Sequence, residues 1–193
     1  ETVSQCDIAR ELGLSKATVA EIFRGLRDEG WIRPVGPGEA SASGGRRPNL
    51  MRFEPGAGRI VGIDVDVRGA VLALTDLGFR PLRRLRTPVK AGAPAAKILD
   101  ALVSGARKLI DEAHGGGAPV LGIGVGLPGA VDAESGVCLF SAKMGWRDVA
   151  VAPVIERRCG LPAFADSGVR VWALAAAAGG AARGARHAAF IRV

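Results

Sequence analysis

Residues 34–48 read PVGPGEASASGGRRP and hold four glycines, three prolines and two serines without helical or strand periodicity. Such a segment continues neither a helix nor a sheet, because proline lacks an amide donor and glycine favours turns. Helical spacing precedes it, and short apolar runs alternating with helical patterns follow it. The 193-residue chain is therefore expected to contain a small N-terminal domain, residues 1–54, and an α/β domain, residues 55–193.

The first part of the chain predicts two helices joined by a tight turn. Ser4 precedes a helix over residues 5–12, with Asp7 as a capping partner, and Gly13 ends it. Ser15 then caps a second, longer helix. Apolar residues at helical spacing predict one buried face: Ile8, Leu12, Leu14, Val19, Ile22, Phe23 and Leu26. Two helices in this arrangement are typical of a helix-turn-helix.

In a helix-turn-helix, the N-terminal residues of the second helix reach base edges in the DNA major groove. We expect that role for the first turn of the second helix and for one later residue: Ser15, Lys16, Ala17, Thr18 and Arg24. The lysine and the arginine would contact phosphate or guanine, and the alanine would contact a thymine methyl. The free N–H groups at the helix start favour a phosphate as well.

Short β-like runs at residues 31–33 and 50–53 flank the glycine-rich loop, as the two strands of a wing would. The loop carries Arg46 and Arg47 between glycines and a proline. A thin, extended loop allows an arginine to enter a narrow minor groove. A solvated basic loop is the alternative for this segment alone, but the helix pair and the loop together predict a winged helix-turn-helix that binds double-stranded DNA.

The net charge of +7 does not support that prediction, because residues 1–54 hold eight basic and eight acidic groups. The excess lies in residues 55–193, where four arginines follow a predicted hairpin: Arg80, Arg83, Arg84 and Arg86. Here a solvated role that protects a sheet edge is favoured over a second contact with DNA.

Several classes of protein are excluded by composition. No apolar run approaches about 18 residues, which argues against a membrane span, and the polar first residues argue against a signal peptide. Cys6, Cys138 and Cys159 are far apart and form no CxxC pair, which argues against a zinc site and a disulfide framework. We expect a cytoplasmic protein without a metal or another cofactor.

The second domain predicts a three-strand meander, a long helix at residues 93–114 and a buried parallel strand at 120–127. Helices at 149–159 and 169–178, a strand at 163–165 and a last strand from residue 187 are expected to follow. Pro128 and Gly129 turn the chain at the C-terminal end of the buried strand, where open α/β sheets bind ligands.

Six segments of the chain resemble the ROK family (repressor, open reading frame, kinase), in the family's order. They are LGLSKATVAEIFRGLRDEGWI, GGRRPNLMRFEP, GIDV, VLGIGVGLPGAVD, GWRDVAVAPVIERRCGLP and GAARG. The resemblance covers nearly the whole chain, and within the family the chain is similar to xylose-operon repressors. It implies a winged helix-turn-helix fused to the first lobe of an actin-like, ribonuclease-H-like sugar-kinase domain. It also implies that the sequence is a fragment, which lacks the first helix of the winged helix-turn-helix and the second lobe of the kinase-like domain.

The resemblance also implies where catalysis would reside in a family kinase. Such kinases hold phosphates with D-x-G-x-T, sugar hydroxyls with the Asn of S-P-N-x-G-W, and use the Asp of E-N-D-x-N as general base. In this chain Asp66 replaces the glycine of the phosphate motif, Lys143 replaces the asparagine of the sugar motif, and Gly168 occupies the position of the general base. Because proton transfer needs a carboxylate within hydrogen-bonding distance, we expect no catalytic residue, unless a two-residue shift places Asp166 there.

We therefore expect a sequence-specific transcriptional regulator of carbohydrate metabolism, acting as a repressor and a homodimer, with the kinase-like lobe as effector sensor and dimerisation module. Its expected ligand-binding residues are Gly129, Lys143, Asp166 and Ser167. Because Lys143 stands in place of a neutral amide, the expected effector is an acidic or phosphorylated sugar. The alternative is that the lobe binds no effector. The alternative is a glucokinase-like ROK sugar kinase with a fused DNA-binding head.

Overall fold

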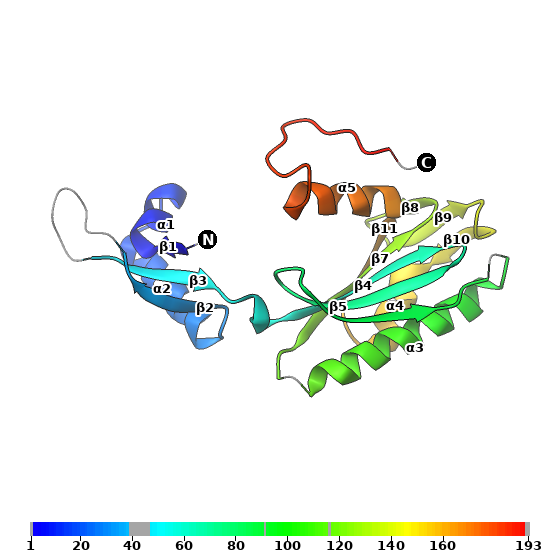
Figure 1. Ribbon diagram of the computed structural model, residues 1–193, viewed down its shortest axis with the longest axis horizontal. Helices are drawn as coiled ribbons and strands as arrows, with labels where there is room; N and C mark the ends of the chain where they lie inside the picture. The colour runs from blue at the N-terminus through cyan, green and yellow to red at the C-terminus, as the bar shows by residue number, and fades with distance from the viewer. Residues whose placement is uncertain (1, 39–46, 91, 116, 192–193) are drawn as a thin grey trace. The chain divides into compact units, whose positions relative to one another are not determined.

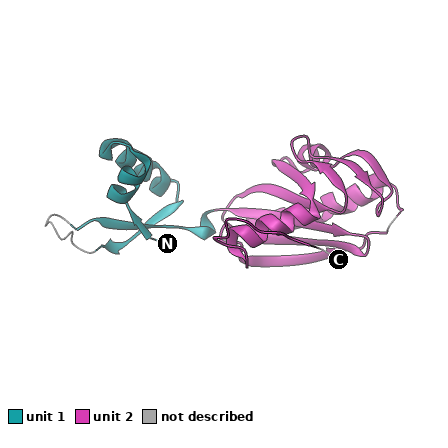
Figure 2. Cartoon of the chain, turned by 90° about the horizontal axis from the view of Figure 1, so that it is seen from above, with its two compact units in different colours: residues 1–57 teal, residues 58–193 magenta. Residues whose placement is uncertain are grey.

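A computed structural model describes residues 2–38, 47–90, 92–115 and 117–191 of the chain. The chain divides into two compact units, residues 1–57 (unit 1) and residues 58–193 (unit 2), which Figure 2 distinguishes by colour. No helix among the described residues is long and apolar enough to cross a lipid bilayer.

Unit 1 combines two helices with a three-stranded antiparallel sheet (Figure 1). Its elements are β1 (Thr2–Ser4), α1 (Gln5–Leu12), α2 (Lys16–Asp28), β2 (Ile32–Pro37), β3 (Asn49–Phe53) and the 3-10 turn η1 (Pro55–Ala57). The strand order is β1-β3-β2, and β1 was not predicted, because three residues are too few to show an alternating pattern. The small core of this unit consists of Ala9, Val19, Phe23 and Met51.

The helix ends in unit 1 follow their local sequence. The Ser4 hydroxyl accepts the N–H of Asp7 and donates to its carboxylate at 2.7 Å, which confirms the predicted capping partner. Gly13 ends α1 in the left-handed conformation (φ 66°). At the end of α2, the N–H of Gly30 bonds to Arg27 and that of Trp31 to Leu26, a Schellman arrangement.

The buried face predicted for these helices is narrower in the structure. Val19 and Phe23 are buried, but the side chains of Leu12, Leu14 and Ile22 are 61, 41 and 47% exposed. Their prediction as core residues was wrong, because helical spacing identifies an apolar stripe and the neighbouring elements determine how much of it is covered.

Unit 2 is built on a five-stranded sheet in the order β11-β7-β4-β5-β6, beside a three-stranded sheet in the order β10-β9-β8 (Figure 1). The strands are β4 (Arg59–Asp66), β5 (Gly69–Asp76), β6 (Pro81–Thr87), β7 (Val120–Leu127), β8 (Ala130–Asp132), β9 (Val137–Ser141), β10 (Trp146–Ala150) and β11 (Ala163–Ser167). The helices are α3 (Ala95–His114), α4 (Val151–Cys159) and α5 (Gly168–Gly179). Strands β4, β7 and β11 are parallel, and β5 and β6 continue antiparallel from β4.

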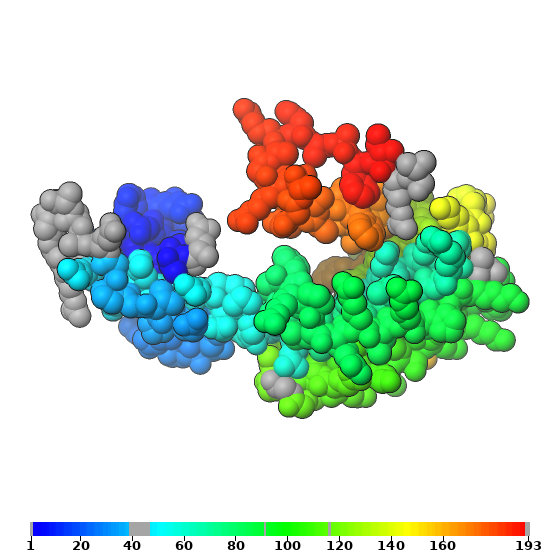
Figure 3. Space-filling view, in the orientation of Figure 1, coloured from blue at the N-terminus to red at the C-terminus, as the bar shows by residue number. Residues whose placement is uncertain are grey.

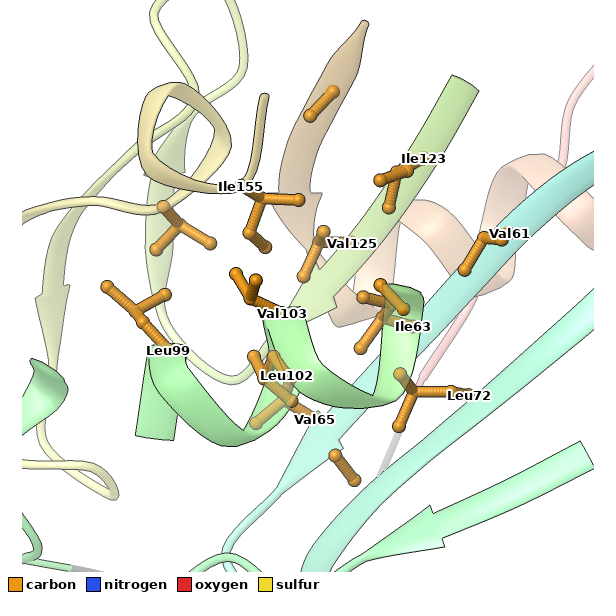
Figure 4. Close-up of a cluster of buried hydrophobic side chains, with 14 of the residues drawn as sticks. Val61, Ile63, Val65, Leu72, Leu99, Leu102, Val103, Ile123, Val125 and Ile155 are labelled. Atoms are coloured by element: carbon orange, nitrogen blue, oxygen red, sulfur yellow. The ribbon is translucent and has the colours of Figure 1, made fainter. Parts of the chain in front are cut away.

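The core of unit 2 lies between the sheet and the helices α3 and α4. Alternate residues of β4 and β7, among them Ile63 and Val125, point toward Leu102 of α3 and Ile155 of α4 (Figure 4). Leu102 and Ile155 are fully buried. The predicted α/β architecture is confirmed.

Helix α5 lies on the other face of the sheet (Figure 1). A methyl group added at Gly126, on the side of β7 opposite to Val125, would lie 3.6 Å from the Cα of Gly168 at the start of α5. The close approach of helix and strand therefore brings the start of α5 to the carboxyl end of β7.

One predicted strand is absent from the structure. Residues 187–191 form no strand, although His187 to Ile191 is an apolar run that favours one. A strand needs a partner for its backbone hydrogen bonds, and no described strand pairs with this run. Conversely, β8, β9 and β10 were missed as strands, because short runs separated by tight turns lack a clear period.

Candidate functional site

A cavity of about 390 Å³ opens in unit 2 where β4, β7 and β11 end. Open α/β sheets bind ligands outside the carboxyl ends of their strands. The walls come from β9, from the turn after β7 and from the start of α5. They consist of Asp66, Leu127, Pro128, Gly129, Ala130, Phe140, Ser141, Ala142, Lys143, Ser167, Gly168 and Val169.

The conformation of Gly129 shapes one wall of the cavity. Its φ of 149° lies in the region that only glycine adopts readily, and an added Cβ would lie 2.5 Å from the Phe140 carbonyl oxygen. The buried hydroxyl of Ser141 donates to the Pro128 carbonyl and accepts the Met144 N–H at 3.3 Å. These contacts join the turn after β7 to β9 at the wall of the cavity.

The two charged residues that line the cavity, Asp66 and Lys143, differ in whether they already have partners. The Asp66 carboxylate accepts the Val67 N–H at 2.7 Å and lies 3.9 Å from the Arg68 guanidinium. Lys143, in the turn after β9, is exposed and forms no ion pair with any described residue. A ligand in the cavity would therefore meet an available ammonium group beside a carboxylate that already has partners.

Of the four predicted ligand-binding residues, Gly129, Lys143 and Ser167 line the cavity. Asp166 does not line it. Its carboxylate accepts the Ser167 N–H at 2.6 Å and pairs with Arg170 at 3.4 Å, one turn into α5. Gly168, which the resemblance predicts at the family's general-base position, lines the cavity without a side chain. Asp66 supplies the carboxylate among the described residues there.

Two features of the cavity region were not foreseen. Phe140 lines the cavity from β9, and its ring stacks under the Arg147 guanidinium at 5.2 Å. The β-branched and aromatic content of residues 137–140 was the available signal. Trp146 is buried in the core rather than on the cavity, and its indole N–H has no hydrogen-bond partner among the described residues.

A shallower hollow of about 520 Å³ lies along α3 and the end of α4. Several of its charged side chains already have partners: Arg158 pairs with Asp100 at 2.6 Å, and Arg107 donates to the Arg158 carbonyl. A ligand would have to displace these contacts, so the hollow is a weaker candidate than the cavity. No group of three or more His, Cys, Asp or Glu gathers among the described residues in a way that would hold a metal ion.

The DNA-contacting residues predicted at Ser15 and in helix α2 are exposed. Ser15 caps α2, and its hydroxyl accepts the Thr18 N–H at 3.1 Å and lies 2.8 Å from the Thr18 hydroxyl. Lys16 and Ala17 in the first turn, and Arg24 two turns on, are exposed. Neither Lys16 nor Arg24 forms an ion pair with a described residue.

The two strands beside the glycine-rich loop are longer than predicted. β2 and β3 pair from Ile32 and Phe53 out to Pro37 and Asn49, with a register shift between Pro34 and Gly36. β2 therefore includes residues 34–37, which were expected to lie in the loop. Arg47 is exposed just before β3, whereas Arg46 lies outside the described residues. The structure thus provides a paired stem for the loop that carries these arginines.

Comparison with known proteins identifies relatives of both units. Residues 60–193 match the sequence family described as "ROK family". The chain is 34% identical over 173 residues to the "Putative xylose repressor" of Caldicellulosiruptor sp. (strain Rt8B.4), across 90% of this chain and 43% of that protein. The chain therefore spans less than half the length of this relative.

Solved structures agree with that result. A ROK family transcriptional regulator, a homolog of the E. coli MLC protein, matches 94% of this chain and 45% of its own, with a TM-score of 0.78 and 22% identity. The ROK hexokinase from Thermus thermophilus matches 65% of this chain and 40% of its own, with a TM-score of 0.56 and 28% identity. The predicted resemblance is confirmed, and the chain belongs to the ROK family.

Proposed function

We propose that this chain acts as a sequence-specific DNA-binding repressor of carbohydrate metabolism, with unit 1 as a winged helix-turn-helix and unit 2 as an effector-sensing and dimerisation module. The extent of the similarities carries the proposal. The similarity to a named repressor spans 90% of the chain, and that to a regulator structure spans 94%. The hexokinase matches only 65% of the chain. That share is smaller than the share of unit 2, which holds 136 of the 193 residues.

The geometry of α2 supports a role in DNA binding. The Ser15 hydroxyl accepts one first-turn N–H, that of Thr18, and the positive end of this exposed first turn faces solvent. Lys16 and Arg24 are exposed cations that form no ion pair with a described residue. Ala17 is a small residue between them that allows close approach to a base edge. This turn would enter the major groove, while Arg46 and Arg47 of the loop would reach the neighbouring minor groove.

Selection of bound duplexes from a random pool, followed by affinity measurement at moderate salt, tests this function. We expect one preferred sequence, and we expect Lys16→Ala, Arg24→Ala and Arg46→Ala together to abolish the preference, since each base contact supplies about 1–3 kcal/mol of discrimination. Arg27→Ala is the matched control, because Arg27 lies in the last turn of α2 and pairs with Asp28. If the preferred sequence is still bound selectively after the triple substitution, the proposed DNA recognition by α2 and the loop of unit 1 is refuted.

For the effector, we propose an acidic or phosphorylated sugar in the cavity. Lys143 lines the cavity and offers an ammonium group that forms no ion pair with a described residue. The family resemblance implies a neutral amide at this position in a ROK kinase. Binding of the sugar would favour one arrangement of the module and so change operator affinity through linkage.

Titration calorimetry with glucose, glucose 6-phosphate and glucuronate distinguishes the classes of effector. We expect the anionic sugars to bind more tightly and Lys143→Asn to remove the difference. Tighter binding of neutral glucose by the unsubstituted chain would contradict an anionic effector without affecting the DNA-binding proposal.

A sugar kinase is the second candidate, and the fold that unit 2 shares with the hexokinase favours it. Phosphoryl transfer needs a base that can reach the sugar hydroxyl, and Gly168 offers no side chain there, while Asp166 is engaged by Arg170. We expect no sugar-dependent ADP release in a coupled assay with glucose or xylose. Turnover that Asp166→Asn abolishes would establish the kinase instead.

A further inference from the structure

The basic excess of the chain lies in unit 2, and its densest part is the hairpin of β5 and β6. Residues 66–90 hold six basic and two acidic groups. Both acids are engaged: Asp66 lies near Arg68, and Asp76 accepts the N–H groups of Gly78 and Arg80 at 2.9 Å each. The hairpin therefore has more cations than its own carboxylates can neutralise.

Strand β6 is an edge of the five-stranded sheet, and its arginines point to two sides. Arg83 pairs with Glu112 of α3 at 3.1 Å. Arg84 and Arg86 share the opposite side, where their cross-strand neighbours on β5 are Ala73 and Val71. Both guanidinium groups are exposed and form no hydrogen bond or ion pair with the described residues.

In Figure 3, β6 and the helix α3 belong to the green part of unit 2. We name the exposed pair Arg84 and Arg86 the β6 arginine surface. Two arginines two residues apart on a strand lie about 7 Å from each other, and each guanidinium matches a phosphate with two parallel hydrogen bonds.

The ends of β6 argue against an added peptide strand as the partner. Pro81 is its first residue and Pro88 follows its last. Proline cannot donate to a ladder, and at an edge it hinders the pairing of another strand. A partner of this edge would therefore bind the side chains rather than the backbone, which fits the phosphates of a nucleic acid better than an acidic peptide.

We propose that the β6 arginine surface binds the phosphate backbone of double-stranded DNA, independently of base sequence. This inference rests on the proposed function, because it assumes that unit 1 brings the chain to DNA. Since residues 1–54 have no net charge, a basic surface on unit 2 would supply part of the salt-dependent attraction to DNA.

The test measures how affinity for a random 30-base-pair duplex depends on salt concentration. It compares the parent chain with a double variant that carries Arg84→Gln and Arg86→Gln. Each phosphate contact adds about 0.9 to the slope of log affinity against log salt concentration. We expect the double variant to reduce that slope by about 1.8, so that the loss of affinity between 50 and 200 mM salt becomes about twelvefold smaller.

Arg183→Gln and Arg186→Gln form the matched control, since both arginines are exposed in unit 2 and the charge removed is equal. We expect this control to leave the slope unchanged. An unchanged slope in the Arg84/Arg86 variant, or an equal reduction in the control, would overturn the inference and leave β6 as an edge protected by charge.

Two further outcomes separate this inference from the proposed function. A reduced slope without any preferred duplex sequence would support the β6 arginine surface and refute the sequence-specific regulator. If the substitutions weaken binding of polyglutamate but not of DNA, the surface serves an acidic protein segment, and the inference is wrong.

Discussion

Gly129 illustrates how one residue without a side chain shapes the candidate effector cavity. With φ at 149° and the Phe140 carbonyl oxygen 2.5 Å from an added Cβ, any other residue must move the turn or β9. The sequence pointed to Gly129 as a ligand contact, and the structure adds a conformational reason for glycine at this position.

Gly129→Ala is expected to lower the free energy of unfolding by about 1–3 kcal/mol, the usual cost of a strained backbone conformation. Urea denaturation measures the change. Gly124→Ala is the control, because an added Cβ at Gly124 in β7 meets no atom within 4 Å. Equal effects of the two substitutions would show that the turn tolerates a side chain.

Asp132 begins the turn between β8 and β9, and the donors around it depress its pKa. The Ser135 hydroxyl is the main cause, at 2.5 Å, and the Glu134 N–H at 3.2 Å adds to it. Because the folded pKa lies below the ordinary value of 3.8, this stabilisation is complete above the ordinary value and is lost as the pH falls through the lowered one.

Ser135→Ala is therefore expected to raise the pKa of Asp132 toward its ordinary value, as measured by NMR titration. The pKa of Asp7, which the Ser4 hydroxyl lowers in unit 1, is the internal control and should not move. The variant should be less stable than the parent chain near neutral pH, and the difference should vanish in acid. A difference that persists in acid would assign the effect to packing.

Helix α2 depends on its cap, which is also part of the proposed DNA-reading turn. Ser15→Ala removes the acceptor of the Thr18 N–H and should cost about 1 kcal/mol, which lowers the melting temperature of unit 1 by about 4–8 °C. Ser15→Asp should keep the cap while placing a negative charge near phosphate.

Thermal melting and duplex affinity of the two Ser15 variants distinguish the roles. We expect the aspartate variant to melt like the parent chain but to bind DNA more weakly. If it binds DNA as the parent does, Ser15 lies away from the phosphates, and its role is limited to capping.

The two units differ in how much core they contain. Among the described residues, the core of unit 1 has four buried members and that of unit 2 has twenty-seven. Small cores leave little surplus over chain entropy. We expect amide hydrogen exchange to show weaker protection in α2 than in β4 and β7. Equal protection in all three would mean that the units unfold as one.

Parts of this architecture were predictable because they depend on neighbours in the chain. Ser4, Gly13 and Ser15 cap helices through bonds to residues at most four positions away. The bounds of β7 follow from its own apolar run. The ROK segments also located the turn at Gly129, which lines the cavity.

Other features depend on parts of the chain that are distant in sequence, and only the folded chain reveals them. Leu12 has the spacing of a core residue, but no described element buries it. Phe140 reaches the cavity because β9 pairs with β8 and β10. Arg83 and Arg84 are alike as neighbours, yet Glu112 of α3 neutralises only the first. Local hydrogen bonds and periodicity can be recognised in a sequence, whereas burial, cavity walls and charge pairing arise from which surfaces meet.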